Sequence, residues 1–412
     1  MDRLLNTIRP YAWGSTTALP ELMGTAPDGT PQAELWMGAH PAAPSRLLRA
    51  SGPEPLDALI RARPAAELGA ATLRRFGPRL PFLLKLLAVE SPLSLQVHPD
   101  LAQAAVGHRI ENSQGVPLDA PHRNYRDDNH KPEMIVALGS FEGLCGFRPP
   151  AHCADLLEAL RLPELAPHAG ALRKEPEESA LRAVFSAFLA APGALVDAVA
   201  ASVAREAEGA GRHRSVWEAY DGIARARPGD PGLLAALMLQ HVRLAPGEGI
   251  FLGAGVPHAY LSGLGVEIMA ASDNVLRCGL TSKHVDAEEL LRVVRFTASP
   301  VRVLRPAARG TEAEEVYPAP VDDFRLSRVR PSGGSCVVLD ATAPQILVCT
   351  RGRIGLNGPH GSLTLEPGDS AYAPAGEQIT LRGEGEVFRA TVDTGHAHEE
   401  GRATGVRMKS CD

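Results

Sequence analysis

The sequence has few aromatic residues, no surplus of positive charge and no long apolar run. Phe, Trp and Tyr supply 5% of its 412 residues, which disfavours the stacking platforms that bind single-stranded nucleic acid. The formal net charge is −6 at pH 7, so no basic surface is expected to attract a phosphate backbone. No apolar stretch approaches the roughly 20 residues of a membrane span. We therefore expect neither a nucleic-acid partner nor a membrane.

Cysteine is sparse and irregularly spaced. The six cysteines contain no CxxC pair, which disfavours a zinc finger or a disulfide framework. We expect free thiols in a cytoplasmic protein. The opening stretch MDRLLNTIRPYAWGS reaches Pro10 without a long apolar run, so no targeting segment is predicted either.

Turn residues, by contrast, are abundant. The 40 Gly and 35 Pro make 75 of 412 residues, and many turns indicate many short strands. Hydrophobic residues at 44% and charged residues at 22% are typical of a soluble globular protein. A chain of this length is expected to form about two or three domains.

The character of the sequence changes at about residue 150. Residues 1–149 alternate short apolar runs, such as PFLLKLLAV and EMIVAL, with loop residues, and predict strands. Residues 150–242 are rich in Ala, Leu and Glu and carry apolar stripes at helical spacing. We predict helices over 155–161, 181–189, 194–207, 215–226, 232–242 and 286–294.

A repeated motif suggests the fold class. Two segments, beginning at Gly247 and Gly368, share the frame of a strand, a Gly-rich turn and a return strand. Both resemble the second cupin motif, G-x5-P-x-G-x2-H. The first copy ends in His258, whereas the second has Ile379 at that position. We therefore predict a mainly β protein with two cupin-like, jelly-roll β-barrels and an inserted α-helical domain.

These patterns divide the chain into four parts. A discontinuous, metal-binding catalytic cupin domain is expected to combine residues 1–149 with 243–320. The helical domain, 150–242, is inserted between the two pieces. A C-terminal cupin-like β-domain without metal ligands is expected over 321–394, followed by a polar, loose tail over 395–412.

The candidate metal ligands come from separate segments. Gln96 and His98 stand two residues apart in SLSLQVHPD, so a strand would turn both to one face. Glu133 follows in NHKPEM and His258 in GVPHAY. Two imidazoles, a carboxylate and an amide oxygen suit Zn²⁺ and leave a net positive site that favours an anionic substrate. The ordinary alternative is two structural histidines, an edge glutamine and a Glu133–Lys131 surface pair.

Longer motifs identify a family. The segments occur in family order and are YAWGS, ELWMGAHP, PFLLKLL, SLSLQVHPD, NHKPEM, GVPHAYLSG and EIMAASDNVLRCGLTSKH. Together they resemble type I phosphomannose isomerases. The resemblance implies a role in carbohydrate metabolism, including GDP-mannose biosynthesis. One departure is Ser282, which precedes Lys283 where the family often has Pro.

The resemblance also implies an activity and a site. It implies interconversion of mannose 6-phosphate and fructose 6-phosphate through a cis-enediol, with one Zn²⁺ per chain. It implies Gln96, His98, Glu133 and His258 as the zinc ligands, and it points to Arg277 as a catalytic residue.

The proton carrier and the phosphate ligands remain open at this level. The candidate proton carriers are Glu267, Asp273, Lys131 and His130. The candidate phosphate ligands, besides Arg277, are Lys85, Ser94 and Lys283, since phosphate needs cationic or hydroxyl donors.

Two other functions are compatible with parts of the sequence. A cupin dioxygenase or another metal-dependent sugar enzyme would keep the fold, but redox cupins use three histidines, so Gln96 argues against them. A non-catalytic sugar-phosphate-binding cupin would not need an intact ligand set. We expect a small-molecule sugar phosphate as partner, and a monomer or weak homodimer.

Overall fold

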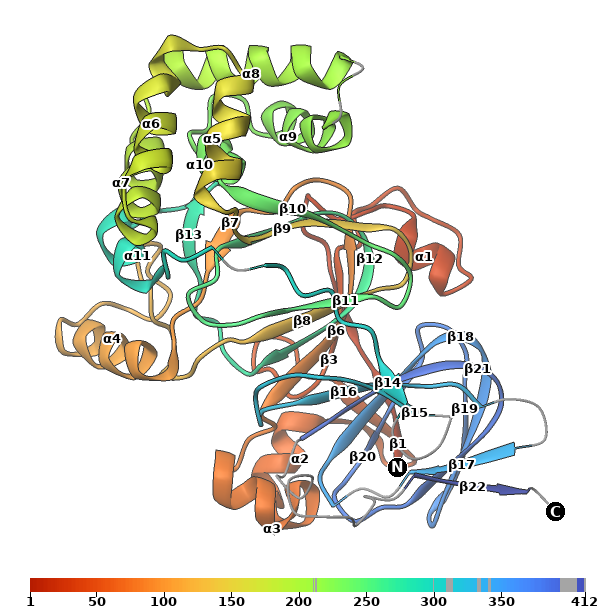
Figure 1. Cartoon of the computed structure of the whole chain (residues 1–412). Helices are drawn as coiled ribbons and strands as arrows, with labels where there is room; N and C mark the ends of the chain where they lie inside the picture. Colours follow the sequence, from red (N-terminus) through yellow and green to blue (C-terminus); the bar gives the residue numbers. More distant parts are fainter. Residues whose placement is uncertain are drawn as a thin grey trace.

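Two large antiparallel sheets and eleven α-helices make up the described part of the protein (Figure 1). The computed structural model describes residues 1–209, 211, 213–298, 300–308, 314–331, 335–339, 342–392 and 406–410. The mixed β and α class predicted from the sequence is confirmed. Among the described strands the pairings close neither sheet into a ring, so jelly-roll barrels are not confirmed.

The ten-stranded sheet carries the candidate ligands. Its main path is β10 (Leu239–Leu244), β9 (Phe141–Phe147), β12 (His258–Ala270), β6 (Phe82–Val89), β3 (Glu34–Met37) and β2 (Thr7–Arg9). Its remaining strands are β7 (Leu95–Val97), β8 (Glu133–Ala137), β11 (Gly249–Leu252) and β13 (Leu276–Gly279).

The long strand β12 organises this sheet because it pairs with four others. Its first half pairs with β9 and β7, and its second half pairs with β6 and β8. Gly263 lies between the halves with φ +118°, and a Cβ there would stand 2.5 Å from the Ser140 carbonyl oxygen. The glycine therefore allows β12 to change from pairing with β9 and β7 to pairing with β6 and β8. The register sets His258 opposite Gln96.

The twelve-stranded sheet contains both ends of the described chain. Its main path is β14 (Ala307–Ala308), β15 (Glu314–Tyr317), β16 (Arg325–Val329), β21 (Ile379–Thr391), β18 (Gln345–Gly358), β20 (Ser370–Ala373), β1 (Asp2–Leu5), β4 (Arg46–Arg49) and β5 (Gly52–Pro55). Attached to it are β17 (Ser335–Leu339), β19 (Gly361–Leu365) and β22 (Val406–Ser410). The first strand of the chain thus pairs with β20, close to the C-terminal end of the sequence.

Most helices gather at one end of the molecule (Figure 1). That group comprises α5 (Pro150–Ala159), η1 (Pro163–Leu165), α6 (Ala166–Lys174), α7 (Glu177–Leu189), α8 (Gly193–Glu208), α9 (Arg214–Ala226) and α10 (Gly232–Leu237). The others are α1 (Ala18–Leu22), α2 (Leu56–Ala62), α3 (Pro64–Phe76), α4 (Leu101–Ser113) and α11 (Ala287–Val293). No single described helix is long and apolar enough to cross a bilayer; α7 and α8 meet that test only as a pair, bent by 104° at their break.

The apolar stripes of the helical segment pack as the sequence predicts. Val184, Phe185 and Phe188 of α7 are buried. They belong to one continuous core with Leu95 and Val97 of the ten-stranded sheet. The helices therefore stabilise the strand that carries Gln96, rather than forming a separate core.

Three local predictions were wrong. The helix expected over 232–242 ends at Leu237, because the following residues pair with β9 as strand β10. Helices α1, α2, α3, α4 and α6 were not predicted. Within the tail expected to be loose, Val406–Ser410 forms β22 and pairs with β17, and the rest of 395–412 lies outside the described residues.

The cysteines also depart in part from expectation. The free thiols Cys145, Cys153, Cys278 and Cys349 are all buried. Cys336, in β17, is disulfide-bonded, which corrects the prediction that all six are free. Spacing along the chain could not reveal this bond, because disulfide formation depends on which segments the fold brings together.

Candidate functional site

Three predicted ligands meet at the ends of their strands. Glu133 begins β8, His258 begins β12, and His98 directly follows β7. Each is at most 2% exposed. Their ligand atoms all lie within 4.8 Å of one another, and each imidazole Nε2 is 3.4 Å from a Glu133 carboxylate oxygen. The sheet thus brings together two imidazoles and a carboxylate, which bind divalent transition metals.

The hydrogen bonds of the two imidazoles point their free nitrogens at this centre. His98 Nδ1 is 2.8 Å from the Asn274 carbonyl oxygen, and His258 Nδ1 is 2.9 Å from that of Val256. A carbonyl can only accept, so each Nδ1 carries the proton and each Nε2 keeps its lone pair. His98 Nε2, His258 Nε2 and Glu133 Oε2 are buried without hydrogen-bond partners. Such unpartnered atoms fit a bound cation.

The protonation states agree with this arrangement. Burial lowers the pKa of His98 to about 4, against the opposing effect of Glu133. Burial alone would raise the pKa of Glu133, but Lys131 and the imidazoles outweigh it and hold that pKa well below its usual range. Near neutral pH the centre therefore contains a neutral His98 and a carboxylate, the forms that coordinate a metal.

Gln96 lies beside the three buried ligands. It stands opposite His258 in the β7–β12 pairing and opposite Arg277 in the β7–β13 pairing. It is partly exposed, and it lines a cavity of about 340 Å³ together with Glu133.

This cavity, the ligand cavity, brings together most of the predicted site residues. The predicted residues that line it are Lys85, Ser94, Gln96, Lys131, Glu133, Glu267, Asp273, Arg277 and Lys283. His98 and His258 contact Glu133 without appearing in the lining. His130 does not line it either; its Nε2 lies 3.0 Å from Asp323 Oδ2.

One wall of the ligand cavity holds a buried lysine between two carboxylates. Lys85 Nζ is 3.0 Å from Glu267 Oε2 and 3.4 Å from Glu34 Oε2. It also lies 5.3 Å from the ring centroid of Trp36, whose Nε1 donates to Glu34. The pairing of β12, β6 and β3 explains this wall, because Glu267, Lys85 and Trp36 are successive cross-strand partners.

The charges on this wall shift each other's pKa. Burial would lower the pKa of Lys85, but Glu267 and Glu34 outweigh it and raise that pKa. The pKa of Glu267 is raised by burial, with Lys85 opposing and Glu133 and Glu34 adding to the rise. Glu267 is therefore a more basic carboxylate than one on the surface.

The other candidate proton carriers differ in their surroundings. Lys131 Nζ lies 3.1 Å from Glu133 Oε1. Asp273 Oδ1 lies 3.2 Å from His40 Nε2, and this contact, with burial opposing, lowers the pKa of Asp273. Asp273 is thus a weaker base than Glu267.

The ligand cavity also has a cationic group, Arg277 and Lys283 in its lining with Arg126 nearby. The pKa of Arg277 is lowered by burial and by Arg126. The pKa of Lys283 is lowered by Arg277, by burial and by Arg126. These pKa shifts mean that Arg126, Arg277 and Lys283 lie close enough to repel one another. An anion placed among them would be stabilised.

Sequence reasoning missed four residues of this site. Glu34, Trp36 and Arg227 line the ligand cavity, and Arg126 lies close enough to affect Arg277. Glu34 and Trp36 lie in the motif ELWMGAHP, so the family motif could have indicated both residues. Nothing in the sequence marked Arg126 or Arg227, because each is one Arg among many in charged segments.

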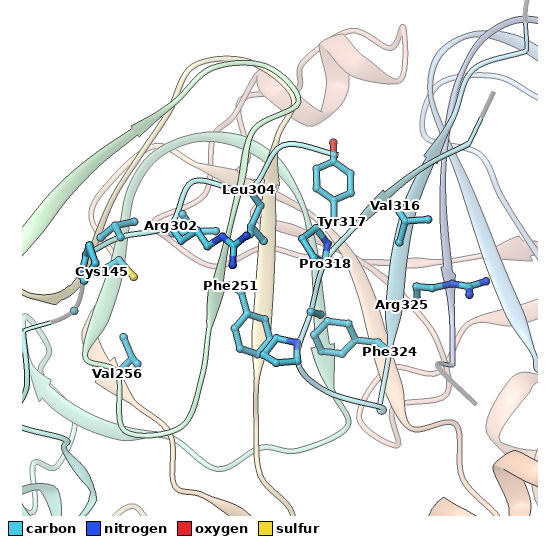
Figure 2. Close-up of a pocket in the computed structure, with 16 residues that line it drawn as sticks. Cys145, Phe251, Val256, Arg302, Leu304, Val316, Tyr317, Pro318, Phe324 and Arg325 are labelled. Carbon is cyan, nitrogen blue, oxygen red and sulfur yellow. The ribbon is translucent and has the colours of Figure 1, made fainter. Parts of the chain in front are cut away.

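A larger cavity of about 490 Å³ lies elsewhere, against both sheets. Figure 2 shows Phe251, Leu304 and Phe324 among the apolar side chains around it. No Asp, Glu or His of the described residues lines it. It therefore lacks the general acid, base and metal ligands that the ligand cavity contains.

Comparison with known proteins agrees with the motifs. A family model described as phosphomannose isomerase type I, catalytic domain, matches residues 1–150. Mannose-6-phosphate isomerase of Escherichia coli (strain K12) is 39% identical over 394 residues, which cover 94% of this chain and 99% of the relative. The mannose-6-phosphate isomerase of Bos taurus is 33% identical over 407 residues, covering 91% of this chain and 93% of the relative.

Solved structures share the fold. A single-residue variant of phosphomannose isomerase from Salmonella typhimurium has a TM-score of 0.87 and 37% identity, covering 95% of this chain and 99% of that chain. A zinc-bound mannose 6-phosphate isomerase has a TM-score of 0.86 and 37% identity, with the same coverage. Sequence identity of this level over nearly the full length of both chains shows common membership, and the chain belongs to the type I phosphomannose isomerase family.

Proposed function

We propose that this chain interconverts mannose 6-phosphate and fructose 6-phosphate and that one zinc ion per chain serves the reaction. The observation that carries the proposal is the ligand cavity itself. Glu133 lines it and brings the two unpartnered imidazole nitrogens of the metal centre to its edge, Glu267 supplies a buried basic carboxylate, and Arg277 and Lys283 supply clustered cations. A polar, anionic sugar phosphate fits these three features together.

Gln96, His98, Glu133 and His258 would hold the zinc ion. The fit rests on the buried, unpartnered atoms of the last three and on the position of Gln96 opposite His258. When bound, zinc would supply a Lewis acid that orients and polarises sugar oxygens. The carbonyl partners of the two imidazoles keep the ring orientations that coordination needs.

Glu267 is the proposed proton carrier. An aldose–ketose isomerisation moves a proton between C1 and C2, which in this proposal passes through a cis-enediol. A carboxylate with a raised pKa can accept that proton and return it to the neighbouring carbon. Lys85, 3.0 Å from Glu267, would hold the carboxylate in place. Lys131 remains a second candidate, whereas Asp273, with its lowered pKa, and His130, paired with Asp323, are less suited.

The cationic group would serve the charges of the substrate. Arg277 would donate paired hydrogen bonds to the oxygen on which negative charge develops. Lys283, with Arg126 and Ser94, would bind the phosphate. Each of these donors except Arg126 lines the ligand cavity.

Further parts of this proposal concern the whole chain. Both sheets would be cupin-like, with a metal in the first alone. The helical domain, 150–242, would be an insertion between 1–149 and 243–320, and 321–394 would form the second β-domain, with 395–412 as the tail. The protein would act in the cytoplasm as a monomer or weak homodimer.

Turnover tests the proposal directly. Purified protein is incubated with mannose 6-phosphate, and fructose 6-phosphate is detected by a coupled assay, with and without prior chelation. We expect product formation that chelation removes and added zinc restores. Absence of fructose 6-phosphate from a zinc-loaded, folded sample would refute the proposed reaction, and the non-catalytic sugar-phosphate-binding alternative would then be favoured.

A further inference from the structure

The helical segment reaches the ligand cavity through the turn that joins α9 to α10. Arg227, the first residue after α9, lines the ligand cavity. The same turn contains Asp230 and leads into Gly232, the first residue of α10, and both residues contact the loop after β13. That loop carries Lys283, which also lines the ligand cavity. Two segments far apart in sequence therefore meet at one wall.

Asp230 ties these two segments together with a single carboxylate. Its Oδ1 accepts from the backbone N–H of Gly232 at 2.8 Å, and its Oδ2 accepts from the backbone N–H of Thr281 at 2.9 Å. The first bond shapes the turn that contains Asp230, and the second reaches across to the loop. Hydrogen bonds to a charged acceptor are stronger than neutral ones, so this side chain is suited to fix the position of the loop.

The two backbones touch where the turn meets the loop. A Cβ on Gly232 would stand 2.6 Å from Leu280 N and 2.9 Å from Gly279 Cα, so only glycine allows this approach. Leu280 has φ +57°, in the left-handed region that residues with a side chain rarely adopt. Its side chain is fully buried in the core shared with the helices. Strain of this kind persists only where neighbouring groups hold it, and here the helical segment does so.

Arg227 adds a cation to the cavity that Arg277 and Lys283 also line. It is exposed, and it has no ion pair among the described residues. By contrast, Arg225, two residues earlier, pairs with Asp221 and does not line the ligand cavity. The guanidinium of Arg227 is thus available to an anionic group of a ligand in this cavity.

We propose that the Arg227–Gly232 turn is a built part of the substrate site, in which Asp230 is a positioning residue for the 279–283 loop and Arg227 binds the substrate phosphate. The inference deepens the proposed function and rests on it for the identity of the substrate. The inserted helices would then help to determine specificity, since they complete the anion-binding side of a site whose metal ligands come from the sheet.

Arg227→Ala tests the phosphate contact. Losing one charge-assisted contact should raise KM for mannose 6-phosphate about tenfold, with kcat within about threefold of wild type. The matched control is Arg225→Ala, the same change two residues earlier, in the last turn of α9, at a side chain that is 76% exposed and directed to Asp221. If both variants shift KM equally, Arg227 binds no substrate.

Asp230→Ala tests the positioning role. The loop would lose its anchor, so KM should rise about tenfold or more while zinc content stays at the wild-type level. Asp230→Asn keeps one acceptor oxygen, so its KM should lie between those of wild type and Asp230→Ala. This variant also tests the role of Asp230 if the Ala variant fails to fold. Asp28→Ala removes another loop carboxylate that accepts from a backbone amide, Thr30 N at 2.9 Å, and should leave KM unchanged. Equal KM in all these variants would overturn the role of Asp230.

Binding of inorganic phosphate separates this inference from the proposed function. Calorimetry on zinc-loaded wild type and variants needs no turnover. Weaker phosphate binding in Arg227→Ala and Asp230→Ala than in their controls supports the inference, even if mannose 6-phosphate is not a substrate. Turnover of mannose 6-phosphate with identical phosphate binding in variants and controls would refute this inference alone.

Discussion

Each of the two sheets contains a long strand of the same length, but only one of the two strands carries a metal ligand. β12 begins at His258 and β21 begins at Ile379, and each is 13 residues long. Each bends at a glycine with φ +118°, Gly263 in one and Gly383 in the other. A Cβ on Gly263 would lie 2.5 Å from the carbonyl oxygen of Ser140, just before β9, and a Cβ on Gly383 would lie 2.4 Å from that of Arg353 in β18. The shared backbone pattern therefore belongs to the fold, not to the chemistry.

The side chains that face inward separate the two sheets. Ile379 packs in a core of Val, Leu and Ile that includes Leu381 and Val387. His258 instead faces Glu133, which lies beside Lys131. The second sheet also has a buried charge pair, Arg389 with Glu314 at 3.1 Å, and there Glu314 also accepts from the Ser327 hydroxyl, whereas Glu133 keeps a buried Oε2 without a hydrogen-bond partner beside its ion pair with Lys131. Function follows from a few unpartnered polar atoms placed on a common scaffold.

The largest effect is expected from His258→Ala. Removing one imidazole should abolish zinc binding and lower turnover by at least about 10³-fold, because the remaining ligands no longer form a closed set. Metal analysis and the coupled assay on the same preparation measure both, and circular dichroism checks the fold. Full zinc content in this variant would show that His258 is not a ligand.

Arg277→Ala should have the next largest effect. If Arg277 stabilises charge that develops in the transition state, kcat should fall by about 10²–10³-fold with a smaller change in KM. Arg277→Lys should recover only part of the rate, since an ammonium lacks the planar pair of donors. Zinc content should be unchanged. A raised KM with normal kcat would instead assign Arg277 to phosphate binding.

Glu34→Gln should change the pH dependence more than the maximal rate. Glu34 raises the pKa of Glu267, so removing its charge should lower that pKa. The rate rises as Glu267 loses its proton, and the acidic limb of the profile of kcat against pH should therefore move to lower pH. Glu314→Gln, which removes a similarly buried carboxylate of the other sheet, is the control. A shift of the same size in both variants would contradict the role of Glu34.

Ile379→Ala should affect activity least. The side chain is fully buried, so the cavity left behind should cost about 2–5 kcal/mol in the free energy of unfolding. Zinc content and kcat of the folded fraction should match wild type. Denaturant unfolding and the coupled assay, run side by side, test this; a loss of zinc equal to that of His258→Ala would remove the distinction between the sheets.

Much of this site could be predicted because its metal ligands lie in short, recognisable motifs. The His98–Glu133–His258 cluster was predicted from three short motifs. Glu34 escaped notice because its role depends on β3 lying against β6, a pairing distant in sequence. Arg227 and Asp230 escaped for the same reason, since a turn between helices gives no sign of the loop it will contact.

The fold was predictable to a similar degree. The amphipathic stripe of α7 was confirmed, because local periodicity reports which face is buried. The sequence after α10 was wrongly expected to be helical, since its Leu, Gln and His residues tolerate either structure and pairing with β9 decides the outcome. Membership of β1 in the second sheet rests wholly on its pairing with β20.

Titration of the metal-free protein with zinc tests the central claim most directly. Protein is stripped with a chelator, zinc is added in known ratios to chain, and turnover of mannose 6-phosphate is measured at each point. The account predicts activity that rises linearly and stops rising at one zinc per chain, with no response in His258→Ala. Full turnover by protein verified to be zinc-free, or a break at two zinc ions per chain, would contradict it.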